Sequence, residues 1–264
     1  MPEQFCSLPL TDVAQLTDDT YLYTFALARP IAQPDSAVWS VWVKDDTLQA
    51  ARRYTPVNVP DTADAPISHL QLAVRVYPDG QVSRFLWRKR IGDHVELCGP
   101  KLTWKYQAQK HRHVLLLAGG TGVTPMLQLL HYALRDPSDS TRFTLVYAAR
   151  SDQDHMLSAD LDRLQQQHPE RLRLRYLAER VTQSGSNKKD GRGWQGGTGR
   201  ITQDEVEHAA TWPEEQQRAS LVVLCGPDGM MHALAGRKRT DADPGPVNGL
   251  LARMGYRDDQ VVKL

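Results

Sequence analysis

The chain has 264 residues, enough for one large domain or two of ordinary size. Its 32 basic and 31 acidic residues leave a formal net charge of +1, which does not support nucleic acid or an anionic membrane as the main partner. No apolar run approaches the roughly 20 residues of a membrane-spanning helix, so no transmembrane segment is expected in this chain. The first ten residues lack the features of a secretory signal, and a removed anchor or transit peptide is left open.

Residues 1 to about 108 are expected to be short strands with one helix. Patterns rich in β-formers cover residues 20–27, 38–43, 69–77 and 94–98, and Pro-containing loops separate them. A helix is expected over residues 82–90. This arrangement is typical of a small antiparallel barrel.

From residue 112 the pattern changes to alternating strands and helices. Strands are predicted at 113–120, 142–150, 172–177 and 220–226, and helices at 125–134, 158–168 and 202–209. The last helix carries a capping-box pattern at Thr202 and Glu205. Such alternation predicts a doubly wound parallel sheet. A polar linker at 105–112 sets the predicted domains at 1–108 and 109–264, with polar surface loops at 182–199 and 237–249.

The loop "GGTGVTP" (119–125) is expected to bind phosphate. Its glycines allow a sharp turn, Thr124 is predicted to be an N-cap, and Pro125 suits the first helical position. The free N–H groups of the following helix favour a pyrophosphate. The absence of a Lys after the second Gly argues against a nucleoside triphosphatase. A tight turn with no ligand remains the alternative.

A second strand is predicted to end at Cys225, followed by Gly226, Pro227 and a helix. Open α/β sheets bind ligands at the carboxyl ends of their strands, so both loops are expected to flank one crevice.

The three cysteines, Cys6, Cys98 and Cys225, are too few and too scattered for a disulfide framework, a zinc site or an all-Cys iron–sulfur cluster. A reducing intracellular compartment is therefore expected, cytoplasmic or mitochondrial. No metal site is predicted, because His111 and His113 have no third ligand nearby in sequence.

Together, "GGTGVTPM" (119–126) and "CGPDGMM" (225–231) resemble the ferredoxin–NADP reductase superfamily, specifically its NADH–cytochrome b5 reductase branch. The blocks "RRYTPVN" (52–58), "LAVRVY" (72–77) and "GQVSRFL…IGDHVELCGP" (80–100) support the resemblance. It implies an antiparallel Greek-key FAD-binding barrel followed by a doubly wound parallel-sheet domain that binds NAD(P)H.

By resemblance, Arg52 pairs with the FAD pyrophosphate, Tyr54 packs on the isoalloxazine and Thr55 lies near flavin N5. In a strand, residues 52 and 54 share a face, and an Arg fork suits phosphate as a Tyr plane suits a flat ring. A solvated Arg and a core Tyr are the alternative.

Arg75 and Tyr77 match the basic and aromatic positions of a family strand. Gly80, Val82 and Ser83 match the block whose helix N-terminus receives the FAD phosphates, although Ser83 could equally be a simple N-cap.

The resemblance assigns Cys225 a catalytic role beside the nicotinamide and flavin, and a buried small hydrophobe is the alternative. Thr55 is the second catalytic candidate. The remaining candidates for nicotinamide-cofactor binding come from the two loops: Gly120, Thr121, Gly122, Thr124, Pro125, Gly226, Pro227 and Met230.

Glu179 matches an acidic position that accepts hydrogen bonds from the adenosine ribose, which favours NADH over NADPH. Alternatively it is a surface Glu beside Arg180. Lys188, Lys189 and Arg192 could compensate a 2′-phosphate, so NADPH is left open.

The chain departs from the family pattern at Arg53, at Asn58, at Asp228-Gly229 and in the tail "GYRDDQVVKL", which lacks a terminal aromatic. This tail, together with "GPKLTWKY" (99–106), resembles divergent fungal members, some of them mitochondrial and linked to cytochrome c haem attachment.

The implied function is a monomeric flavoenzyme that takes hydride from NADH and passes single electrons to a haem protein such as cytochrome b5 or another one-electron acceptor. The alternative is an FAD-binding assembly protein, such as a haem-attachment accessory, with weak NAD(P)H turnover.

Overall fold

The computed structural model describes residues 4–35, 37–46, 50–58, 60, 62, 65–182, 194–212, 219–240 and 243–264. The chain divides into two compact units. Unit 1 comprises residues 1–106 and 127–136, and unit 2 comprises residues 107–126 and 137–264.

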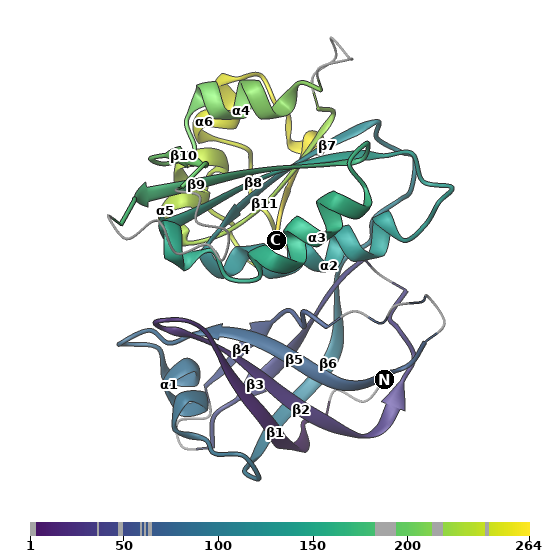
Figure 1. Cartoon of the computed structure of the whole chain (residues 1–264), viewed down its shortest axis with the longest axis vertical. Helices are drawn as coiled ribbons and strands as arrows, with labels where there is room; N and C mark the ends of the chain where they lie inside the picture. Colours follow the sequence, from purple (N-terminus) through teal and green to yellow (C-terminus); the bar gives the residue numbers. More distant parts are fainter. Residues whose placement is uncertain are drawn as a thin grey trace. The chain divides into compact units, whose positions relative to one another are not determined.

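Unit 1 is built on a six-stranded antiparallel sheet (Figure 1). Its strands are β1 (Cys6–Thr17), β2 (Thr20–Ile31), β3 (Val38–Lys44), β4 (Ala51–Tyr54), β5 (Ile67–Arg75) and β6 (His94–Trp104). Their order in the sheet is β4-β3-β6-β1-β2-β5, so β6 lies between β3 and β1 in a Greek-key arrangement. One helix, α1 (Gln81–Arg88), connects β5 to β6.

The two ends of this sheet meet at the segment after β4. Pro56 forms a bridge with Leu72 of β5, and the Val57 N–H donates to the Gln71 carbonyl at 2.9 Å. The Asn58 amide donates to the His69 carbonyl at 2.8 Å and accepts from the Gln71 N–H at 2.7 Å. Asn58, a departure from the family pattern, thus continues the barrel closure with its side chain. The predicted antiparallel barrel is confirmed.

Strand β1 was not predicted. Its sequence, "CSLPLTDVAQLT", contains a proline and lacks sustained alternation, yet it pairs with both β2 and β6. Leu8 and Leu10 are buried in the barrel core together with Phe25, Leu72 and Leu86. Packing against both neighbouring strands, rather than local propensity, therefore explains this strand.

Unit 2 is built on a six-stranded parallel sheet in the order β10-β9-β8-β7-β11-β12. Its strands are β7 (His113–Gly119), β8 (Arg142–Ser151), β9 (Leu172–Arg180), β10 (Gly197–Thr198), β11 (Leu221–Cys225) and β12 (Val261–Lys263). The helices are α2 (Val123–Leu134), α3 (Ser158–Gln167), α4 (Gln203–Ala210), α5 (Asp228–Ala235) and α6 (Gly249–Arg253). Short 3₁₀ turns cover Gly120–Gly122, Asp152–Asp154 and Asp258–Gln260.

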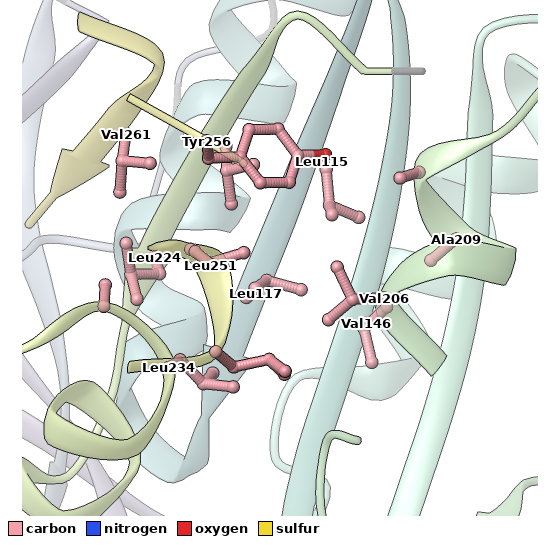
Figure 2. Packing of buried hydrophobic residues seen from close by; sticks show 14 of the residues in the cluster. Leu115, Leu117, Val146, Val206, Ala209, Leu224, Leu234, Leu251, Tyr256 and Val261 are labelled. Atoms are coloured by element: carbon pink, nitrogen blue, oxygen red, sulfur yellow. The ribbon is translucent and has the colours of Figure 1, made fainter. Parts of the chain in front are cut away.

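Helices cover both faces of this sheet. Figure 1 shows α2 and α3 on one face and α4 and α6 on the other. On the second face, Leu115 and Leu117 of β7 pack with Val206 of α4, Leu251 of α6 and Val261 of β12 (Figure 2). All residues of β7 are buried, as expected for a central parallel strand. The predicted doubly wound sheet is confirmed.

The C-terminal elements α6 and β12, and the two-residue β10, were not predicted. β12 has three residues and pairs with β11 through Val261 and Val262, which is too short for a periodic signal. Thr202 accepts from the Glu205 N–H at 3.3 Å, which confirms the expected cap of α4. Among the described helices, none is both long and apolar enough to cross a bilayer.

Candidate functional site

Four predicted cofactor residues of unit 1 come together on β4 and at the end of β5. Burial raises the pKa of Tyr54 to about 12, the nearby Arg52 charge lowers it, and the Tyr77 ring raises it further. The Arg75 guanidinium lies over the Tyr77 ring at 5.7 Å. Two guanidinium groups and two aromatic rings therefore lie close together here, those of Arg52, Arg75, Tyr54 and Tyr77.

Arg75 has an unused hydrogen-bond donor. Its Nε donates to the Asp19 carboxylate at 3.0 Å, which anchors the side chain to the β1–β2 turn. Its second terminal nitrogen is buried and has no hydrogen-bond partner. A buried unpaired donor is costly, so an acceptor such as an oxygen of FAD fits here.

The N-terminus of α1 lies directly after these residues. Gly80 is the N-cap and supplies no side chain, so Ser83 is not the N-cap. The Ser83 hydroxyl instead donates to the Gly80 carbonyl and accepts from the Tyr77 N–H, both at 3.2 Å. The Val82 side chain is buried in the barrel core. The first turn of α1 thus has no side-chain cap, and its backbone N–H groups suit a phosphate.

Thr55 follows β4 directly, half-buried and just before the barrel-closing Pro56. Its place next to Tyr54 agrees with the predicted position in the block, and its role near flavin N5 stays a prediction.

In unit 2, the two predicted loops pack against each other. β7 and β11 are neighbours in register, with Ala118 opposite Cys225. A Cβ on Gly122 would overlap the Cys225 carbonyl, so only glycine allows this approach. Met230 of α5 lies beside Gly119, where an added Cβ would be 2.5 Å from its sulfur. The structure thus brings the two loops together at the carboxyl ends of adjacent strands.

The predicted N-cap at Thr124 is wrong. The glycines form a 3₁₀ turn, Gly120–Gly122, that leads directly into α2 at Val123, so the helical conformation begins before Thr124. The Thr124 hydroxyl donates to the Thr121 carbonyl at 3.1 Å instead of accepting from a backbone N–H. Pro125 is consequently the third residue of α2 and not the first. The open N–H groups belong to the glycine turn itself.

Cys225 is the last residue of β11 and half-buried, and it carries a thiol. The next turn has Pro227 as the N-cap of α5. Asp228 and Gly229 begin this helix, where a carboxylate complements the helix dipole. The role of Cys225 beside the nicotinamide stays a prediction.

Glu179 lies near the end of β9 and forms an ion pair that was not predicted. Arg200, just beyond β10, donates to its carboxylate at 2.9 and 3.5 Å. Both side chains are solvent-exposed. Lys188, Lys189 and Arg192, the predicted phosphate-compensating residues, lie outside the described residues.

Sequence reasoning also missed His155. Its Nε2 lies 3.2 Å from the Tyr147 carbonyl of β8 and 3.1 Å from the Leu177 carbonyl of β9. Its ring stacks on Trp194, with centroids 5.2 Å apart. Burial lowers its pKa, so the neutral ring joins the two strands near Glu179. A lone His after a strand carries no sequence signal for such a role.

His111 and His113 do not form a metal site with each other. The His111 ring lies 2.9 Å from the Ser220 hydroxyl, and the His113 ring lies 2.9 Å from the Thr144 hydroxyl. The part of the chain that the structure describes contains no cluster of three metal-ligating side chains.

Comparison with known proteins identifies both halves. A family model described as an oxidoreductase FAD-binding domain matches residues 7–106, and one described as an oxidoreductase NAD-binding domain matches residues 116–235. The NADH-cytochrome b5 reductase 2 of Aspergillus clavatus is 33% identical over 260 residues, covering 97% of this chain and 76% of the relative.

Two further comparisons agree. An NADH-cytochrome b5 reductase-like protein of Arabidopsis thaliana is 31% identical over 271 residues, covering 99% of this chain and 77% of the relative. The cytochrome b5 reductase domain of Ulva prolifera nitrate reductase has a TM-score of 0.77 at 26% identity, covering 100% of this chain and 98% of that one. These relatives do not favour the alternative of an assembly flavoprotein. With relatives that match along nearly its whole length, the chain belongs to the NADH–cytochrome b5 reductase family and is an oxidoreductase that uses FAD and NADH.

Proposed function

We propose that this enzyme passes electrons from NADH, through FAD, to a haem protein such as cytochrome b5 or to another one-electron acceptor. The observation that carries the proposal is the unit 1 cluster of Arg52, Tyr54, Tyr77 and Arg75, with one buried donor of Arg75 left for a ligand. The names of its relatives, which refer to cytochrome b5, support the class of acceptor.

Unit 1 holds the flavin. FAD would supply the chemistry, because it accepts one hydride, with its two electrons, and releases these electrons one at a time. Arg52 and the N-terminal turn of α1 at Gly80, Val82 and Ser83 bind the pyrophosphate. Tyr54 covers a face of the flat ring, and Thr55 offers a hydroxyl to its reacting edge.

Unit 2 holds the nicotinamide dinucleotide. The glycine turn before α2 donates backbone N–H groups to the pyrophosphate. The "CGPDGMM" loop, with Gly226, Pro227 and Met230, borders the same strand ends. Cys225 and Thr124 orient the nicotinamide, and Glu179 accepts from the adenosine ribose, which favours NADH over NADPH. Orientation, rather than a strong acid or base, is the contribution of these side chains.

The proposal extends to the organisation and location of the protein. Residues 1–108 form the FAD-binding domain and residues 109–264 the NAD(P)H-binding domain. The enzyme acts as a monomer in a reducing intracellular compartment, cytoplasmic or mitochondrial, where the thiols of Cys6, Cys98 and Cys225 persist.

A spectroscopic titration tests the function. Anaerobic NADH added to the yellow, FAD-loaded protein should bleach the flavin band within the mixing time of a rapid experiment, and NADPH should do so more slowly. Oxidised cytochrome b5 added next should be reduced while the flavin band returns. A flavin band that persists with NADH contradicts the enzyme. A bleached flavin that does not reduce cytochrome b5 contradicts that acceptor.

A further inference from the structure

The C-terminal end of α1 and the turn after it expose large apolar side chains. Trp87 is 57% exposed and Ile91 is 64% exposed, although α1 buries Val82 and Leu86 in the barrel core. The helix lies on the flank of the barrel (Figure 1). Trp87 and Ile91 are therefore not needed to complete the core of unit 1.

The same segment is strongly basic. Residues 84–94 contain Arg84, Arg88, Lys89 and Arg90 but only one carboxylate, that of Asp93. Because residues three or four apart share a helix face, Arg84, Trp87 and Arg88 lie together on the exposed side. The Arg84 guanidinium donates to the Pro78 carbonyl at 3.3 Å, toward the other end of the helix, so Arg88, Lys89 and Arg90 are the cationic residues next to Trp87 in the chain.

The nearby carboxylates leave part of this charge uncompensated. Asp46 pairs with Lys89 at 3.1 Å, and the Asp93 carboxylate accepts the Arg90 backbone N–H at 2.8 Å. Arg88 and Arg90 form no side-chain ion pair within the described part of the chain. The near-zero net charge of the whole chain therefore hides a local positive surface.

We propose that the α1-tip surface, made of Trp87, Arg88, Arg90 and Ile91, docks on an anionic lipid membrane. Trp suits the headgroup region, where its ring lies at the boundary and its N–H remains hydrated. Each Arg or Lys near an anionic bilayer strengthens binding roughly fivefold. A protein partner fits less well, because a stable protein interface needs about 800 Å² per side around an apolar core, and only two large apolar side chains are exposed here.

This inference goes beyond the proposed function and does not depend on it. The flavin-binding end of α1 is its N-terminus at Gly80, whereas Trp87 and Ile91 lie at the other end. Eight helical residues span about 12 Å, so docking leaves the N-terminal turn unchanged. The enzyme would bind the membrane reversibly, since only a few side chains insert.

Vesicle sedimentation of the full, FAD-loaded chain tests the proposal. The chain should sediment with vesicles of phosphatidylcholine and phosphatidylserine at low salt, and remain in solution with phosphatidylcholine alone. High salt should release it, since exposed charges are screened. Arg88→Gln with Arg90→Gln should lower the partition coefficient by about 25-fold, and Arg88→Glu with Arg90→Glu should lower it further. Trp87→Ser with Ile91→Ser should also lower the partition coefficient at low salt, although the basic residues are unchanged.

Matched controls lie elsewhere on unit 1. Leu102→Ser replaces an equally exposed apolar residue, and Arg29→Glu with Lys101→Glu reverses two other exposed charges. These controls should sediment like the unmodified chain, and all variants should keep their FAD and its reduction by NADH. Failure of the unmodified chain to bind anionic vesicles, or an equal loss in the controls, overturns the proposal. The proposal is also overturned if the chain binds a soluble acidic protein but no vesicles, and if the same variants abolish that binding.

Discussion

Arg52 and Arg53 are adjacent in β4, yet their guanidinium groups have different surroundings. Arg53 lies opposite Trp42 of β3 and over its ring at 5.6 Å. Arg52 lies on the other face, which it shares with Tyr54. The family pattern has a proline where this chain has Arg53, and the contact with Trp42 gives that departure a structural role. Of the two residues, only Arg52 is placed to meet a cofactor beside Tyr54.

This difference predicts the effect of two matched substitutions. Arg52→Ala should raise the Kd of FAD about tenfold, since an exposed charge-assisted hydrogen bond is worth roughly 1.5 kcal/mol. Arg53→Ala should leave the Kd within about twofold and lower stability slightly, because Arg53 lies over Trp42 on the other face of the strand from Tyr54. Fluorescence titration of the apoprotein with FAD measures both values. Equal losses of affinity in the two variants would contradict the assignment.

Cys225 permits a test on the nicotinamide side. Cys225→Ser keeps the volume almost unchanged but replaces a soft, apolar sulfur by a hydroxyl. FAD content should stay the same, and flavin reduction by NADH should slow at least about tenfold if the thiol positions the nicotinamide. Stopped-flow absorbance measures this rate. Cys98→Ser in β6 is the control, and its flavin should be reduced at the rate of the unmodified chain. An unchanged rate in Cys225→Ser would exclude a role of this thiol in positioning the nicotinamide.

At the scale of the element, His155 joins the neighbouring strands β8 and β9. Its ring lies within hydrogen-bond distance of one carbonyl from each strand and stacks on Trp194. The carboxyl ends of these strands carry Glu179, so His155 braces the region that is proposed to receive the adenosine. A neutral imidazole suits this position, because burial lowers the pKa of His155.

The lowered pKa makes a prediction about acid stability. Between pH 6.5 and the lower folded-state value, the unfolded chain takes up a proton that the folded chain does not. The contribution of His155 is therefore fully present above pH 6.5 and is lost as the pH falls through this window. At its steepest the slope approaches about 1.4 kcal/mol per pH unit for one proton.

Two variants isolate this effect. His155→Gln and His155→Phe should both lower stability at neutral pH, and both should flatten its dependence on pH below 6.5 relative to the unmodified chain. Burial also lowers the pKa of His111 and of His168, so some acid dependence should remain in both variants. Urea denaturation at a series of pH values measures the curves. Curves parallel to that of the unmodified chain would show that His155 does not titrate in this way.

The elements that sequence could predict were those with a strong local pattern. In β7 a continuous run of apolar residues predicts a buried strand, and in β2 the alternation of residues predicts a strand with one buried face. The strand β1, by contrast, depends on pairing with β2 and β6, which no local pattern encodes. At the site, "RRYTPVN" led to Arg52 and Tyr54, but Arg200 and His155 were missed. Their contacts join residues 21 to 22 positions apart across two strands or a loop.

At the scale of the whole molecule, unit 1 is not continuous in the chain. It includes residues 127–136, which form most of α2, although this helix begins at the glycine turn of unit 2. Within unit 1, the buried Gln128 accepts the Trp39 N–H at 2.8 Å and donates to the Pro56 carbonyl at 3.1 Å. Pro56 both closes the barrel and follows Thr55. One side chain of α2 therefore supports the backbone next to the proposed flavin-binding block.

Gln128→Leu tests this dependence. The substitution introduces an apolar side chain of similar size and leaves a buried N–H at Trp39 and a buried carbonyl at Pro56 without Gln128 as a partner. We expect a loss of about 2–6 kcal/mol in the free energy of unfolding, at roughly 1–3 kcal/mol for each of the two unsatisfied groups. FAD should also dissociate more readily, because Pro56 is adjacent to Thr55. Gln166→Leu, at an exposed position of α3, should change stability by less than about 0.5 kcal/mol. Urea denaturation and FAD retention on a desalting column provide the two readouts. If Gln128→Leu lowered stability without any loss of FAD, Gln128 would support the barrel but not its cofactor site.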